Sequence, residues 1–128
     1  KSHLLLQGRA GTWEEKVGGS TPPLRTSEGW LIIYHGVENG GKGYYRAGAA
    51  LLDLNDPTKV IARLKNYILE PEFDYELEGF YKGCVFPTGN VIVDDTLFVY
   101  YGAADKHVGV ATCLVSELLN ELQNQQNV

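Results

Sequence analysis

The sequence predicts an all-β fold that ends in one short helix. Short runs of β-branched and aromatic residues recur along its 128 residues, and 15 glycines lie between these runs, where tight turns need them. Helical spacing of apolar residues is confined to the C-terminal end. With 44% hydrophobic and 21% charged residues, the composition is that of a globular chain and argues against disorder.

Strands are expected throughout the central part of the chain. They are predicted over residues 30–34, 44–54, 59–64, 84–86, 90–93, 96–101 and 108–113. Turn-forming segments separate them, at 38–43, 55–57 and 87–89. Residues 1–27 are expected to form a lead-in strand and loop.

The tail differs from the rest of the chain. Residues 114–128 are predicted to be a helical tail beginning near Val115, because Leu118, Leu119 and Leu122 fall on one face of a helix. Ser116 is a candidate N-cap for this helix, although it could instead lie in a turn.

A weak internal repeat suggests how the strands are arranged. Residues 29–36 (GWLIIYHG) resemble residues 95–102 (DTLFVYYG), and each segment is followed by a turn and a further strand rich in small residues. The separation of these two segments along the chain exceeds the roughly 40–50 residues of one propeller blade, but it is compatible with a blade that carries a long loop. Radial β repeats therefore fit the pattern better than a sandwich does.

Composition excludes several functional classes. A net charge of −5 argues against a protein that coats nucleic-acid phosphates, and no apolar run approaches the roughly 20 residues of a membrane helix. Cys84 and Cys113 lack the spacing of a zinc site, so no metal is expected and both are predicted to be small buried residues. The chain contains no Met and begins with Lys1, so we expect a segment of a longer protein or a processed chain.

Residue patterns alone identify no complete catalytic site. No nucleophile lies in a recognisable elbow, and the acidic residues of 70–78 resemble a solvated face. His35, Glu76 and Asp105 stand out because they lie beside aromatic residues and glycines at the ends of predicted strands or in loops. Each of them either is a satisfied structural group or lines a pocket.

A series of motifs resembles glycoside hydrolase family 130, which contains phosphate-dependent β-mannoside phosphorylases. The resemblance runs from about residue 18 to residue 113, and the motifs occur in this order: 29–37, 49–57, Pro71 with Tyr75-Glu76 and Gly79, 85–87, and 100–105. The resemblance implies a five-bladed β-propeller of well over twice this length. This chain would be its C-terminal portion, about two blades over residues 28–113 plus the tail.

The resemblance also implies a reaction and a set of roles. The reaction would be inverting phosphorolysis to mannose 1-phosphate, with phosphate as co-substrate and no cofactor. The aspartate that acts as general acid would lie upstream of Lys1, and so would most of the basic residues that clamp phosphate. His35 and Tyr45 match phosphate-binding residues, while Asp105 and Glu76 match carboxylates that contact the sugar. Arg46 matches no assigned role, and Gly83 stands where relatives often carry Asn.

Three functions remain open at this point. The chain is a piece of a phosphorylase, inactive alone because it lacks the acid; or a piece of a hydrolase of the same family; or a non-catalytic carbohydrate-binding or structural module. The expected partners are a β-mannoside oligosaccharide, phosphate, and either further copies of the chain or the missing blades. Nucleic acid and membrane are not expected partners, and a cytoplasmic location suits a sugar-phosphate product.

Overall fold

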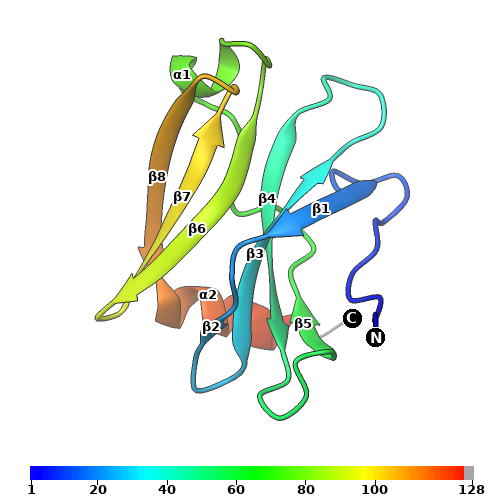
Figure 1. The fold of residues 1–128 in the computed structure, drawn as a ribbon, viewed down its shortest axis with the longest axis vertical. Helices are drawn as coiled ribbons and strands as arrows, with labels where there is room; N and C mark the ends of the chain where they lie inside the picture. The colour runs from blue at the N-terminus through cyan, green and yellow to red at the C-terminus, as the bar shows by residue number, and fades with distance from the viewer. Residues whose placement is uncertain (126–128) are drawn as a thin grey trace.

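Two antiparallel β-sheets pack against each other in the computed structural model, which describes residues 1–125 (Figure 1). The first sheet contains β1 (Lys16–Ser20), β2 (Leu24–Arg25), β3 (Trp30–Val37), β4 (Tyr45–Leu52) and β5 (Val60–Arg63). Its order is β1-β3-β4-β5, and β2 also pairs with β3. The second sheet contains β6 (Val85–Val93), β7 (Thr96–Ala103) and β8 (His107–Leu114) in chain order.

Two helices complete the fold. The one-turn helix α1 (Asp74–Leu77) lies at one end of the sheets, and α2 (Val115–Asn124) lies at the other end (Figure 1). The predicted all-β fold with a short C-terminal helix is therefore confirmed, while residues 126–128 of the predicted tail lie outside the described residues. No helix among residues 1–125 is long and apolar enough to span a membrane.

The main core lies between the two sheets and is closed by α2. Alternate residues of β3 and β4 face it, including Leu31, Ile33 and Leu51, and Leu97 and Val99 of β7 meet them from the second sheet. The buried leucines of α2 (Leu118, Leu119 and Leu122) cover its end, as their helical spacing predicted. Burial of this apolar surface is the main force that holds the sheets together.

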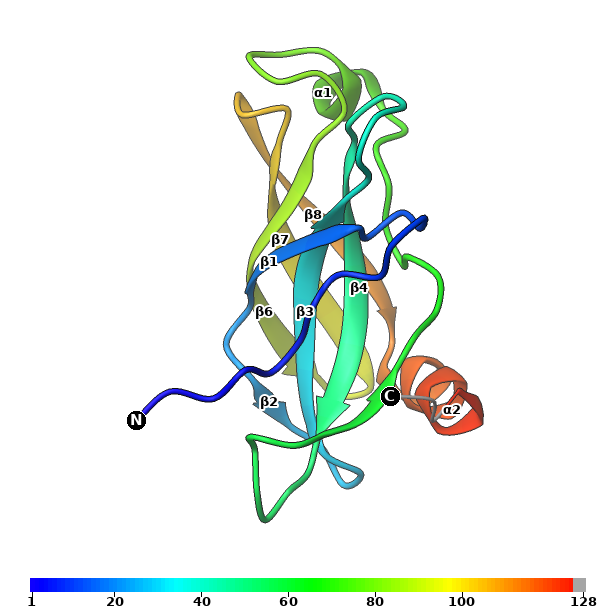
Figure 2. The same ribbon diagram turned by 90° about the vertical axis from the view of Figure 1, so that its right-hand side faces the viewer.

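The central strand β3 is buried on both faces. Its even-numbered residues Ile32 and Tyr34 form a second cluster, which is covered by Leu6, Trp13 and Val17. Figure 2 shows the N-terminal segment crossing this face of the sheet. Burial on both faces explains why the strand is a continuous apolar run and does not alternate.

The internal repeat corresponds to two equivalent strands. β3 and β7 are each a central strand of their sheet, and each leads through a turn into the next antiparallel neighbour. Residues 29–36 and 95–102 thus have matching positions in the two sheets.

Some predicted boundaries were wrong. Residues 84–86 and 90–93 do not form separate pieces, because β6 continues through Pro87–Gly89 with a shift of register, as in a β-bulge. The strand predicted over 44–54 ends at Leu52, since the Asp53 carboxylate accepts backbone hydrogen bonds from Asn55 and Asp56 and forms a turn.

The N-cap prediction was also wrong. The N-cap of α2 is Leu114, which has no side-chain cap, and Ser116 lies inside the first turn. Asp95, from the turn between β6 and β7, accepts hydrogen bonds from the backbone N–H and the hydroxyl of Ser116 at 3.1 and 2.5 Å. A carboxylate from another element therefore supplies the cap.

Candidate functional site

Three polar side chains share one face of the first sheet at the end of β3. Val37 lies directly opposite Lys16 of β1 and opposite Tyr45 of β4. Directly paired residues point to the same face, and His35 lies two residues before Val37, so Lys16, His35 and Tyr45 lie on a common face. The rings of His35 and Tyr45 are 5.3 Å apart between centroids. The structure therefore brings together the two residues that the sequence linked to phosphate.

The His35 imidazole is packed tightly but keeps one unused nitrogen. Its ring lies 4.5 Å from that of Phe86 on β6, and its Nδ1 is buried without a hydrogen-bond partner among residues 1–125. Burial lowers the pKa of His35, and a hydrogen bond to the Gly19 backbone partly opposes this shift. The neutral imidazole is thus favoured, and since its N–H is donated to the Gly19 backbone, Nδ1 is a buried acceptor without a partner among residues 1–125.

Gly18 makes room for this imidazole. It lies opposite His35 in the β1–β3 pairing, and a Cβ atom at this position would lie 2.3 Å from His35 Nε2. Any larger residue would push the ring aside. The neighbouring Gly19 has open space where its Cβ would lie.

Tyr81 connects this face to the turn that carries Asp105. Its ring lies edge-on to Tyr45 at 5.1 Å, and its hydroxyl donates to the Gly43 carbonyl at 2.8 Å. Its backbone N–H donates to the Ala104 carbonyl at 3.1 Å. The start of β4 in the first sheet and the β7–β8 turn in the second sheet therefore lie at the same end of the molecule (Figure 1), and Tyr81 contacts both.

Asp105 presents a free carboxylate at that end. Ala104 and Asp105 both have left-handed backbone conformations, with φ of 52° and 54°. Asp105 is exposed, and its carboxylate has no hydrogen-bond or ion-pair partner within residues 1–125. It lies near Cys84, where burial first and the Asp105 charge second raise the pKa of the thiol to about 11.

Glu76, in contrast, is fully engaged by the protein. It is 1% exposed, and its Oε1 accepts the backbone N–H groups of Glu72 and Phe73 at 2.8 and 3.1 Å. Its other oxygen accepts a hydrogen bond from the hydroxyl of Tyr101. These contacts hold α1 against β7, and no carboxylate oxygen is left without a protein donor.

Arg46 points away from the His35 face. Its guanidinium pairs with Glu70 at 3.2 Å and with Glu38 at 3.5 Å, and it lies over the rings of Tyr44 and Tyr67. It therefore contributes to packing on the opposite side of β4.

The two cysteines have different environments. Cys84 is buried, as predicted, but Cys113 is exposed on β8, so the prediction for Cys113 was wrong. The alternation of small and apolar residues along β8 does not reveal that this strand is the exposed edge of its sheet. Residues 1–125 hold no group of three or more His, Cys, Asp or Glu side chains that could bind a metal ion.

Comparison with known proteins identifies the family. A family model described as β-1,4-mannooligosaccharide phosphorylase matches residues 7–124. The chain belongs to glycoside hydrolase family 130. The resemblance found in the sequence motifs is thereby confirmed.

Relatives within family 130 are named phosphorylases. The β-1,2-mannobiose phosphorylase of Thermoanaerobacter sp. (strain X514) is 53% identical over 83% of this chain and 35% of its own length. The β-1,4-mannooligosaccharide phosphorylase of Ruminococcus albus is 35% identical over 98% of this chain and 39% of its own length. This chain thus spans about a third of the length of the curated relatives it matches.

Solved family 130 structures share the fold of this chain. The β-1,2-mannobiose phosphorylase from Listeria innocua, in complex with β-1,2-mannobiose, superimposes with a TM-score of 0.87 and 46% identity. The match covers 94% of this chain and 34% of that protein. A structure described with family 130 hydrolases that target β-1,2-mannosidic linkages in Candida mannan gives a TM-score of 0.76 and 35% identity. That match covers 88% of this chain and 34% of that one.

Lys16 is a further candidate in this family 130 chain that the sequence motifs do not reveal. Lys16 is exposed and has no ion-pair or hydrogen-bond partner within residues 1–125, so its charge is available to an anion beside His35. It was overlooked because the basic phosphate-binding residues were expected upstream of Lys1. Only the register of β1 against β3 shows that Lys16 shares a face with His35.

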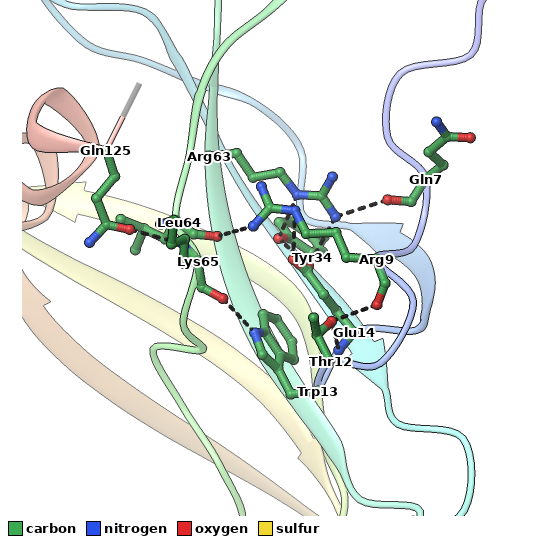
Figure 3. Close-up of polar contacts among 10 residues, drawn as sticks. All are labelled: Gln7, Arg9, Thr12, Trp13, Glu14, Tyr34, Arg63, Leu64, Lys65 and Gln125. Atoms are coloured by element: carbon green, nitrogen blue, oxygen red, sulfur yellow. Dashed lines mark hydrogen bonds and ion pairs between the residues drawn. The ribbon is translucent and has the colours of Figure 1, made fainter. Parts of the chain in front are cut away.

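A buried charged network was also missed. Glu14 is 0% exposed, and its Oε2 accepts hydrogen bonds from Tyr34 at 2.7 Å and from Arg63 at 3.0 Å (Figure 3). Burial first, and then the hydrogen bond to Glu14, raise the pKa of Tyr34 well above its ordinary range. Residues so far apart in sequence give no local signal of their pairing.

Proposed function

We propose that this chain forms the phosphate-binding wall and part of the mannoside-binding site of an inverting β-mannoside phosphorylase. The observation that carries the proposal is the common face of Lys16, His35 and Tyr45. An ammonium group and a phenol hydroxyl can donate to the oxygens of a phosphate dianion, and the free nitrogen of the neutral imidazole can accept a hydrogen bond from the remaining phosphate O–H. The unused His35 Nδ1 supports a ligand at this face.

In the proposed reaction, a phosphate oxygen attacks the anomeric carbon of the mannoside. The glycosidic C–O bond breaks, and the leaving oxygen takes a proton from an aspartate that we assign to a part of the enzyme outside these residues. The products are mannose 1-phosphate and the shortened sugar. Lys16, His35 and Tyr45 hold and orient the phosphate, which is a co-substrate, and the reaction needs no cofactor.

Asp105 is the proposed acceptor for mannose hydroxyls. A carboxylate can accept two hydroxyl hydrogen bonds at once, and the Asp105 carboxylate is exposed. Glu76 has a weaker case, since three protein donors already occupy its oxygens. We propose that it supports the sugar site from behind by holding α1.

The linkage proposed for the substrate is β-1,2. Three relatives with 47–53% identity are named for β-1,2-linked mannosides, whereas the relative named for β-1,4-linked oligosaccharides has 35% identity. A mixture of the two disaccharides, offered with phosphate to the complete enzyme, tests this. Preferential loss of the β-1,4 isomer would overturn it.

The proposed setting is a five-bladed β-propeller, to which the two sheets contribute about two blades. The four strand positions of the first sheet, β1-β3-β4-β5, support this, because a blade is a four-stranded antiparallel sheet. We further propose a cytoplasmic location, because a charged sugar phosphate is retained inside a cell.

Phosphate binding by the 128-residue chain is the direct test. In a ¹⁵N-NMR titration with inorganic phosphate, amides around Lys16, His35 and Tyr45 should shift, and His35→Ala should weaken binding by about 10- to 100-fold, the range for a hydrogen bond to a charged group. Given β-1,2-mannobiose and phosphate, the same chain should release no mannose 1-phosphate. Release of mannose 1-phosphate by this chain would contradict the assignment of the proton-donating aspartate to another part of the enzyme. Unchanged phosphate affinity in His35→Ala would contradict the proposed role of His35 in phosphate binding.

A hydrolase is the second candidate, because one solved relative is described with family 130 hydrolases. The two reactions differ in product. The complete enzyme should release mannose 1-phosphate at a rate that rises with phosphate concentration. Release of free mannose at a rate that does not depend on phosphate would favour the hydrolase.

A further inference from the structure

Phe80 exposes a large aromatic side chain at the end of the molecule that carries Asp105. It lies in the loop between α1 and β6, and it is 86% exposed. This loop and the β7–β8 turn lie at the same end of the two sheets (Figure 1). Exposing a phenyl ring to water is unfavourable, so a partner that covers the ring would be favoured.

The backbone on both sides of Phe80 is fixed to the β7–β8 turn. The N–H of Tyr81, the following residue, donates to the Ala104 carbonyl at 3.1 Å. The preceding residue, Gly79, approaches the same group so closely that a Cβ atom there would lie 2.4 Å from the Ala104 oxygen. The exposed ring is therefore presented from a fixed backbone, next to the turn that holds the proposed sugar-binding carboxylate.

The turn depends on this loop in return. Ala104 and Asp105 both have left-handed backbones, with φ of 52° and 54°, a conformation that is unfavourable for alanine. Such a conformation persists only where the surrounding structure holds it. The Ala104 N–H donates to the Cys84 carbonyl at 3.0 Å, at the end of the loop that contains Phe80. Phe80 and the Asp105 carboxylate thus belong to one interlocked unit.

The rings of Tyr81 and Phe80 have different surroundings. Tyr81 packs edge-on against Tyr45 at 5.1 Å and so belongs to the proposed phosphate-binding wall. Phe80 carries no group that could bind phosphate, but the face of a phenyl ring suits the apolar C–H face of a sugar. In an inverting displacement, phosphate and the leaving sugar lie on opposite sides of the anomeric carbon. A sugar on the leaving side is therefore a suitable partner for Phe80.

The position of Phe80 also distinguishes a ligand from further blades. In the proposed propeller, neighbouring blades pack through the faces of their sheets around a central channel. Phe80 lies on neither sheet face, because its loop is at the end of the sheets beside α1 (Figure 1). Loops at the ends of a rigid scaffold are where binding residues are usually found.

We propose that Phe80 stacks on the ring of the sugar that leaves with the glycosidic oxygen, and that it sets the affinity for this sugar. The inference rests on the proposed function, in which Asp105 binds hydroxyls of the mannose that is transferred to phosphate. Phe80 contributes binding and takes no part in proton transfer. Its loss should therefore affect the leaving sugar and spare the phosphate and the transferred mannose.

The complete enzyme, run in the direction of synthesis, separates these contributions. Mannose 1-phosphate is the donor and mannose is the acceptor. Phe80→Ala should raise the KM for the acceptor by roughly tenfold, because the sugar loses its apolar contact, and should leave the KM for mannose 1-phosphate unchanged. Phe80→Tyr should keep the KM for the acceptor, since the face of the ring is retained.

Phe73→Ala is the matched control. Phe73 is 58% exposed in the same connection between β5 and β6, but its ring stacks on that of Tyr75 at 5.6 Å. It should leave both KM values unchanged. An unchanged KM for the acceptor in Phe80→Ala would overturn the proposal, and a lower melting temperature with it would assign Phe80 to packing against other parts of the enzyme. A rise in the KM for mannose 1-phosphate alone would also overturn it.

Failure of the proposed function gives a different result. The unchanged enzyme would then make no disaccharide from mannose 1-phosphate and would release free mannose from β-1,2-mannobiose without phosphate. In that case the KM for β-1,2-mannobiose decides the role of Phe80. A roughly tenfold rise in Phe80→Ala, absent in Phe73→Ala, would support the contact with the leaving sugar, and an unchanged KM would overturn it.

Discussion

Glu14 and Arg63 form a buried ion pair, with 3.0 Å between Oε2 and Nη2, although 49 residues separate them in the chain. Arg63 Nε also donates to the Tyr34 hydroxyl at 3.2 Å, and Arg9 pairs with the other oxygen of Glu14 at 3.5 Å. The pair joins the N-terminal segment to β5 across the face of β3 (Figure 3). It therefore closes one side of the first sheet.

Glu14→Gln should destabilise the fold strongly. It removes the charge opposite Arg63, whose side chain is only 8% exposed, and breaking one side of a buried pair costs about 3–5 kcal/mol. Urea denaturation of the variant measures the loss. Glu78→Gln is the control, because Glu78 forms only an exposed pair with Lys82 at 3.9 Å and should change stability little. Similar stabilities for the two variants would contradict this account.

Gly18→Ala should impair phosphate binding more than it impairs folding. The new Cβ would clash with the His35 imidazole and displace it from the Lys16 and Tyr45 face. Gly19→Ala provides the matched control on the same strand, since its Cβ meets nothing within 4 Å. Phosphate titrations followed by NMR should show weakened binding in the first variant only. Equal phosphate affinity in both variants would mean that the position of the His35 ring is unimportant for phosphate binding.

Stability should fall as the pH drops below the ordinary pKa of histidine. Burial lowers the pKa of His35, so the unfolded chain binds a proton more readily than the folded one. The resulting stability is present above about pH 6.5 and is lost as the pH falls from there through the folded pKa. Denaturation at several pH values should show a shallower dependence in His35→Asn. A slope in His35→Asn equal to that of the unchanged chain would contradict this account.

Glu76→Ala should unfold the end of the molecule that carries α1. The substitution leaves two backbone N–H groups and the Tyr101 hydroxyl without their acceptor, at about 1–3 kcal/mol for each unsatisfied buried group. Thermal melting and hydrogen exchange around Tyr101 would report the loss. Glu72→Ala, at an exposed position, should melt like the unchanged chain. A stable Glu76→Ala chain with impaired sugar binding would instead favour direct contact with the substrate.

The sequence predicted the parts of the fold that depend on local patterns. The apolar runs of β3 and β7 and the leucine spacing of α2 each carry their own signal, so these elements were found. The single turn of α1 is too short to show a helical period, and it is held by the buried carboxylate of Glu76. The bulge in β6 is made of turn-forming residues, so the sequence suggests a turn where the strand continues.

The site was predictable only as far as family motifs extend. His35 and Tyr45 were linked by their motif, and the β3–β4 register explains why they meet. Lys16 required the pairing of β1 with β3, which contains a shift of register between Gly18 and Ser20 that sequence spacing does not reveal. The network of Glu14 and Arg63 has no motif, because it depends on how the N-terminal segment crosses the sheet.

The N-terminal segment also constrains the order in which the chain can fold during synthesis. The Trp13 indole donates to the Lys65 carbonyl at 2.8 Å, and Arg63 donates to the Gln7 carbonyl at 3.0 Å. During synthesis, Trp13 and Gln7 must therefore wait for partners that follow 52 and 56 positions later. Until then Trp13 and Leu6 have no sheet to cover, and the growing chain exposes them to chaperones and proteases.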